Sequence, residues 1–184
     1  MDWLRAAFAI VFTLGLFIIS LLVHELGHTV AVWGMMGWDK VKVISAGSVS
    51  FFRHGKLRLG ILPTWGYVLY AEDEATPEMR RIIAVAGPMA SLMLAGVFSL
   101  LHIVIQAKGW SEAMYAMALA NYAICGFNLI PIPPLDGWKV VETYLPSLGI
   151  LLTRESRAKL YQWGTIIVVV GSCLYVAIVG PYHR

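Results

Sequence analysis

Four long apolar stretches constrain the fold of this 184-residue chain more than any other feature of its sequence. A helix of about 20 apolar residues crosses the roughly 30 Å hydrocarbon core of a bilayer. We predict such helices over residues 6–33, 82–106, 113–130 and 160–179. Because 59% of the residues are hydrophobic and only 14% are charged, a globule of this size could not hide its apolar side chains from water. The sequence therefore predicts an integral membrane protein and excludes a water-soluble monomer or a disordered chain.

Residues 41–70 differ in composition from the apolar stretches on either side. They are rich in Val, Ile, Phe and Tyr and are interrupted by glycines, which predicts short antiparallel strands with a turn at His54 and Gly55. Bare strands cannot face lipid, so this sheet must lie at the membrane interface or against the helices. The expected fold is a single α-helical membrane domain over residues 1–184, with about four transmembrane helices and a small membrane-associated hairpin between the first two.

The basic residues predict how the chain is oriented in a cell membrane. Of the 14 Lys and Arg residues, 11 lie in the loops 37–81 and 131–159. Cytoplasmic loops carry an excess of these residues, so we expect both loops in the cytoplasm and both termini outside. The net charge is only +3 and no basic stripe is present, so the expected partner is the lipid bilayer and not a nucleic acid.

The first apolar stretch contains the motif His24-Glu25-Leu26-Gly27-His28. Helix positions i and i+4 share a face, so the two imidazoles could bind one metal ion. Glu25 lies about 100° further round the helix, where it could act as a base on metal-bound water. The alternative is a set of packed polar side chains, which is disfavoured because ionisable groups in a membrane helix are costly and usually functional.

A hydrolytic zinc site uses three protein ligands and one water, so a third ligand must come from elsewhere in the chain. Asp136 is the best candidate. It follows the prolines at 131, 133 and 134, at the same expected depth as the two histidines. By spacing alone, a role as a helix N-cap is equally good for Asp136. The three other histidines are poorer candidates.

The segments "HELGH" and "NLIPIPPLDG" together resemble the site-2 protease family, intramembrane zinc metalloproteases that cut membrane segments of other proteins. The segments "AVAGPMAS" and "PTWGYV" add to this similarity, which indicates a compact member without a PDZ or CBS domain. The resemblance implies that His24, His28 and Asp136 bind one Zn²⁺ per chain and that Glu25 is the general base. It also implies that Asn128 contacts the substrate backbone.

Other positions carry weaker predictions. Trp65, Ser91 and Trp138 depart from the residues common in the family, which would alter substrate fit but not the ligands. Asn121 lies two helical turns before Asn128, and it could bind substrate or bond a neighbouring helix equally well. The spacing of Gly87, Ser91 and Ala95 favours close helix packing over a catalytic role.

These observations predict an endopeptidase that hydrolyses peptide bonds within or near transmembrane segments, with Glu25 taking a proton from zinc-bound water. The expected partner is a transmembrane protein substrate, with room for a regulatory membrane protein. We also hypothesise that an unwound substrate adds as a strand to the edge of segment 41–70. The alternatives are a metal-binding membrane protein without hydrolysis and an adaptor that holds membrane segments.

Overall fold

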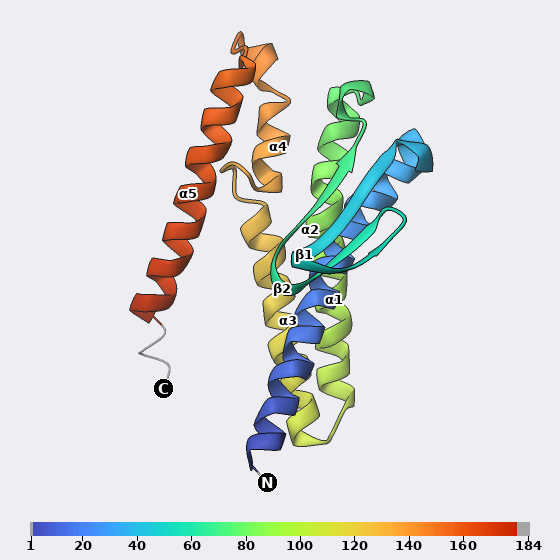
Figure 1. The fold of residues 1–184 in the computed structure, drawn as a ribbon, viewed down its shortest axis with the longest axis vertical. Helices are drawn as coiled ribbons and strands as arrows, with labels where there is room; N and C mark the ends of the chain where they lie inside the picture. The colour runs from blue at the N-terminus through green and yellow to red at the C-terminus, as the bar shows by residue number, and fades with distance from the viewer. Residues whose placement is uncertain (1, 180–184) are drawn as a thin grey trace.

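The structure is a computed structural model that describes residues 2–179 and is mostly helical (Figure 1). The chain contains five α-helices, two strands and three short 3-10 turns over this range. In chain order these elements are α1 (Asp2–Met36), η1 (Trp38–Lys40), β1 (Val41–His54), β2 (Leu57–Tyr70), η2 (Glu72–Glu74), α2 (Pro77–Val104), α3 (Lys108–Asn128), α4 (Asp136–Glu142), η3 (Leu145–Leu148) and α5 (Arg154–Val179).

A long helix lies at each of the four predicted positions, and each begins four to six residues before its predicted start. The added residues include polar first turns, which can extend a helix beyond an apolar core. Two segments, Val11–Met36 and Pro77–Val104, are long and apolar enough to cross a membrane by length and composition. Membrane crossing by α3 and α5 stays a prediction.

Helices α1, α2 and α3 pack side by side and form the core of the fold (Figure 1). One face of α1 carries a residue toward this core at every fourth position: Leu16, Ser20, His24, His28 and Val32. Leu16 packs against a cluster formed by Phe98, Met114, Met117 and Ala118. Val32 packs with Val41, Ile44 and Ile83 in a second cluster beneath the sheet. The two histidines of α1 therefore lie between two apolar clusters.

Strands β1 and β2 form one hairpin that packs against α1. Its turn follows His54, with Gly55 at a φ of 57°, as predicted. The register is irregular, because Ile44 pairs with Val68 and also with Leu57. The chain reverses direction near Gly47 and Val49, both with positive φ, so the tip of the hairpin folds back onto the sheet. This reversal was not predicted from the sequence.

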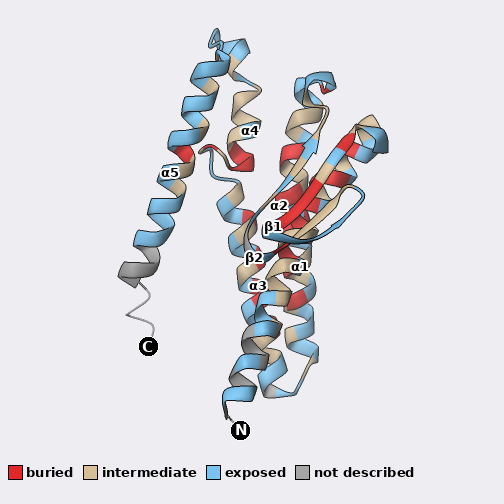
Figure 2. Ribbon diagram, in the orientation of Figure 1, coloured by how far each residue is buried: buried red, intermediate tan, exposed pale blue. Residues whose placement is uncertain are grey.

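Helix α5 stands apart from the three-helix core (Figure 1), and most of its residues up to Leu174 are exposed (Figure 2). Trp163, Ile167 and Leu174 are each more than half exposed. Such a surface is unfavourable in water and suits a lipid environment.

Polar contacts hold the first turns of α5 to the rest of the chain. Arg157 forms ion pairs with Glu72 at 2.9 Å and with Glu142 at 2.7 Å, and the Tyr161 hydroxyl donates to Glu142 at 2.9 Å. Desolvation would lower the pKa of Arg157, but the hydrogen bond to Glu72 and the two carboxylates raise it above its ordinary value. The guanidinium is therefore charged, and it joins α5 to both η2 and α4.

Candidate metal centre

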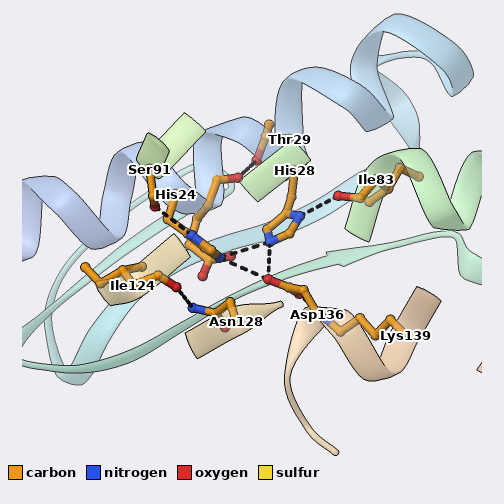
Figure 3. Close-up of polar contacts among 10 residues, drawn as sticks. His24, His28, Thr29, Ile83, Ser91, Ile124, Asn128, Asp136 and Lys139 are labelled. Carbon is orange, nitrogen blue, oxygen red and sulfur yellow. Dashed lines mark hydrogen bonds and ion pairs between the residues drawn. The ribbon is translucent and has the colours of Figure 1, made fainter. Parts of the chain in front are cut away.

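The two histidines of α1 meet the first residue of α4 in the interior of the protein (Figure 3). Asp136 Oδ2 lies 3.1 Å from His24 Nε2 and 3.2 Å from His28 Nε2, and the two Nε2 atoms are 3.3 Å apart. All three side chains are buried. Within the described range 2–179, this is the one group of His, Cys, Asp or Glu ligand atoms that could hold a metal ion.

The spacing of these three atoms fits zinc. A tetrahedral zinc ion with bonds of about 2.0–2.1 Å places its ligand atoms about 3.3–3.4 Å apart. The three observed separations lie within about 0.3 Å of that value. The geometry therefore matches one face of a zinc coordination tetrahedron, with one ligand atom at each of its three corners.

The partners of the other ring nitrogens also fit a metal. His28 Nδ1 lies 2.6 Å from the carbonyl oxygen of Ile83, which can only accept, so this nitrogen carries the proton. In a neutral ring, Nε2 then presents a lone pair toward Asp136. His24 Nδ1 is 2.9 Å from Ser91 Oγ on α2. Lone pairs that converge in a buried space repel one another, and a cation between them removes the repulsion.

The proline-containing turn after α3 delivers Asp136 to the site. Helix α4 begins at Asp136 and packs closely on the residue that follows α3. The approach is so close that a Cβ at Gly137 would overlap the Leu129 carbonyl oxygen. The N-cap alternative for Asp136 is not what the structure has, since Leu135 occupies that position. Burial alone would raise the pKa of Asp136, but the two neighbouring histidines and the Lys139 ammonium hold the pKa well below the usual range.

Two glycines make room for the motif on α1. A Cβ at Gly66 on β2 would lie 2.5 Å from Glu25 Oε1, and a Cβ at Gly87 on α2 would overlap the imidazole of His28 at Nε2. Glu25 itself is 5% exposed. The Glu25 carboxylate therefore lies against the backbone of β2, directly beside the candidate ligand His24 in the sequence.

The interpretation of Gly87 and Ser91 as helix-packing residues alone is incomplete. Both residues lie where α2 packs on α1, but they also contact the imidazoles of His28 and His24. Their four-residue spacing equals that of the two histidines, so each small residue faces one ring. That match between the two helices is the signal that sequence reasoning missed.

The two asparagines of α3 occupy different settings. Asn121 is fully buried, and its Nδ2 donates to Ser20 Oγ at 3.0 Å and to the Met117 carbonyl at 2.9 Å. This is the interhelical arrangement, and it leaves Asn121 no exposed surface for a substrate. Asn128 is half-buried at the end of α3, where its Nδ2 donates to the Ile124 carbonyl at 2.9 Å (Figure 3).

A cavity of about 710 Å³ opens beside the site. Its lining includes His28, residues 67–70 of β2, Lys139 of α4 and Arg157 of α5. The cavity therefore connects one candidate ligand with the strand β2 and with the space between the core and α5.

The sequence profile described as "Peptidase family M50" matches residues 12–107 and 96–171. The chain belongs to peptidase family M50. This membership confirms the predicted site-2 protease family and the predicted enzyme class, a zinc metalloprotease. The predicted zinc cofactor is confirmed as well, with His24, His28 and Asp136 as a group that could bind one ion.

Relatives of this M50 protein have names of the same kind. One from Methanocaldococcus jannaschii, named "Putative zinc metalloprotease", is 32% identical over 77% of this chain and 82% of its own length. One from Bacillus subtilis with the same description is 26% identical over 90% of this chain and 80% of its own length.

A solved structure shares the fold of this M50 protein. It is the "Site-2 Protease from Methanocaldococcus jannaschii", and it superposes with a TM-score of 0.62 at 23% sequence identity. The match covers 88% of this chain and 66% of that chain.

Proposed function

We propose that this M50 protein hydrolyses peptide bonds within or near the transmembrane segments of other membrane proteins. The observation that carries the proposal is the meeting of His24, His28 and Asp136 inside the fold, because the two histidines lie on a helix that is apolar enough to span a membrane. A peptidase site at that position is suited to substrates that are themselves embedded in lipid.

The residues of the site divide into metal ligands, a general base and a substrate-binding residue. His24, His28 and Asp136 hold the metal ion, which when bound polarises a carbonyl and makes water more acidic. A Glu25 carboxylate oxygen accepts the proton of the attacking water and then returns it to the leaving amine nitrogen. The Asn128 side chain orients the substrate backbone.

The substrate must be unwound before hydrolysis, because a helix closes its backbone hydrogen bonds internally. In our proposal the substrate adds as a strand along β2, whose residues 67–70 line the cavity beside His28. Residues 66–68 pair with β1 on one side, and no strand of the described range 2–179 pairs with the other edge.

Proline substitutions test this edge. Successive backbone N–H groups point to opposite edges of a strand, so one of Val68→Pro and Leu69→Pro removes a donor from the free edge and the other removes one from the β1 pairing. We expect the variant that removes the free-edge donor to slow cleavage with zinc content unchanged. Equal cleavage by both variants and the wild type would exclude strand addition.

The membrane arrangement is part of the proposal. The loops 37–81 and 131–159 face the cytoplasm, both termini lie outside, and the site opens toward the cytoplasmic side. Residues 1–184 then form one membrane-embedded protease domain. In support of this arrangement, α1 begins and α5 ends in the lower half of the view in Figure 1.

The test compares wild type with Glu25→Gln, both purified in detergent and supplied with a panel of membrane-segment peptides. Removal of a general base costs about 10²–10⁴ in rate, so we expect Glu25→Gln to lose cleavage while one zinc per chain is retained. Cleavage by Glu25→Gln at the wild-type rate would refute the assigned base. Zinc binding without cleavage by the wild type would favour a metal-binding protein, and a protein that needs no zinc would favour an adaptor.

A further inference from the structure

The two oxygens of the Asp136 carboxylate have different partners. Oδ2 faces both imidazoles (Figure 3). Oδ1 instead accepts a hydrogen bond from Lys139 Nζ at 2.8 Å. Lys139 lies one helical turn after Asp136 on α4, and within residues 2–179 Asp136 is the partner of its ammonium group. The pair therefore divides the carboxylate into a metal-facing oxygen and a lysine-facing oxygen.

This division matters because a carboxylate can bind a metal through one oxygen or through both. A bidentate carboxylate would take up the coordination position that hydrolytic zinc sites keep open for water. Hydrogen bonds to metal ligands fix their orientation and tune the metal site. The ammonium group on Oδ1 would prevent that oxygen from turning toward the ion.

We propose that Lys139 is a positioning residue that keeps Asp136 a one-oxygen ligand and so preserves the open position on zinc. This inference rests on the proposed zinc site. Lys139 acts through Asp136, and it lines the cavity beside His28. The ammonium of Lys139 stays within reach of water, because 48% of the side chain is exposed.

The positive charge of Lys139 would change zinc affinity in the opposite direction to its positioning of Asp136, which makes the inference testable. A positive charge near a cation repels it, so charge alone predicts that removal of Lys139 tightens zinc binding. Orientation of Asp136 predicts that removal of Lys139 weakens it. The direction of the change therefore distinguishes the two effects.

The experiment measures zinc affinity by competition with a chromophoric chelator, using the 184-residue chain in detergent. We expect Lys139→Met to raise the zinc Kd about 10–100-fold, the usual cost of losing a partner of a metal ligand. Lys139→Arg retains a cationic donor and should stay near the wild type. Lys159→Met is the matched control, because Lys159 pairs with Glu155 on α5 and is 66% exposed.

The cobalt-substituted proteins provide a readout that a purely structural role would not move. Four-coordinate Co²⁺ absorbs more strongly in the visible range than five-coordinate Co²⁺. We expect a weaker band in Lys139→Met, as both carboxylate oxygens reach the ion. Circular dichroism of the metal-free proteins shows that each variant is folded, and Lys139→Gln repeats the test if Lys139→Met is not.

A double-mutant cycle with Asp136→Asn tests whether Lys139 acts through Asp136. In the Asp136→Asn background, Lys139→Met should have no further effect on zinc affinity. Unchanged or tighter zinc binding by Lys139→Met, with an unchanged cobalt band, would overturn the inference alone. Failure of the wild type to bind zinc would overturn the proposed metal site as well.

Discussion

Each imidazole of the candidate site is fixed at both of its ring nitrogens. On the far side from Asp136, His24 contacts Ser91 and His28 contacts the Ile83 carbonyl, and both partners lie on α2. Such outer contacts set the tautomer and the orientation of a metal-binding histidine. The affinity of the site therefore depends on α2 as well as on the ligands themselves.

Gly87 provides the sharpest test at this scale. In Gly87→Ala the added methyl would overlap His28 Nε2, so the ring must move. We expect zinc affinity to fall at least about 10-fold, measured by chelator competition. Gly96→Ala on the same helix is the control, because nothing lies within 4 Å of the Cβ it adds.

Where the added methyl group meets no other atom, alanine stabilises a helix by about 1 kcal/mol relative to glycine. Gly96→Ala should therefore unfold at the same or a higher temperature than the wild type. If Gly87→Ala gained stability and kept its zinc affinity in the same way, the close approach of α2 to His28 would be wrong.

At the scale of elements, α5 meets the segment that carries Asp136. A Cβ at Gly164 would overlap the Pro133 carbonyl oxygen, and Pro133 belongs to the turn between α3 and α4. Gly164 is buried, although most of α5 is exposed. This contact gives α5 a route by which it can affect the position of the third ligand.

Gly164→Ala should therefore separate α5 from the turn. Overpacking of a close contact costs about 1–3 kcal/mol, so we expect a lower unfolding temperature and slower cleavage. Gly171→Ala, two turns further along α5, adds a methyl with nothing within 4 Å and should leave both quantities unchanged or raise the unfolding temperature. Equal behaviour of the two variants would show that α5 does not press on this turn.

At the scale of the whole molecule, one metal ion would join segments that are far apart in the chain. The histidines belong to α1 and the aspartate to α4, and Asp136 lies 112 positions after His24 in the sequence. Apart from the ion, packing on α2 and α3 brings these helices together. A bound ion would therefore stabilise the assembled fold and not one helix alone.

Zinc should accordingly stabilise the metal-free protein against unfolding. At a free zinc concentration about 100 times the Kd, the gain is about 2.7 kcal/mol, which thermal unfolding in detergent would detect. Removal of zinc with a chelator should reverse the gain. Asp136→Asn should lose most of it, and a full gain in that variant would show that Asp136 is not a ligand.

The sequence by itself determined the helices and the motif on α1. Apolar stretches report burial or lipid exposure locally, and the four-residue spacing of His24 and His28 places both on one face of any helix. The hairpin turn at Gly55 was predictable because it, too, depends on the residues next to it in the sequence. These features depend on neighbours within about one or two turns of the chain.

The tertiary structure alone decided how the site is completed. It assigned the two oxygens of Asp136, aligned Ser91 with His24, buried Asn121 against Ser20 and folded the hairpin back at Gly47. Each of these outcomes depends on which residues distant in the sequence come within a few ångströms of one another. Such distances follow from the packing of whole helices, which no local pattern of residues encodes.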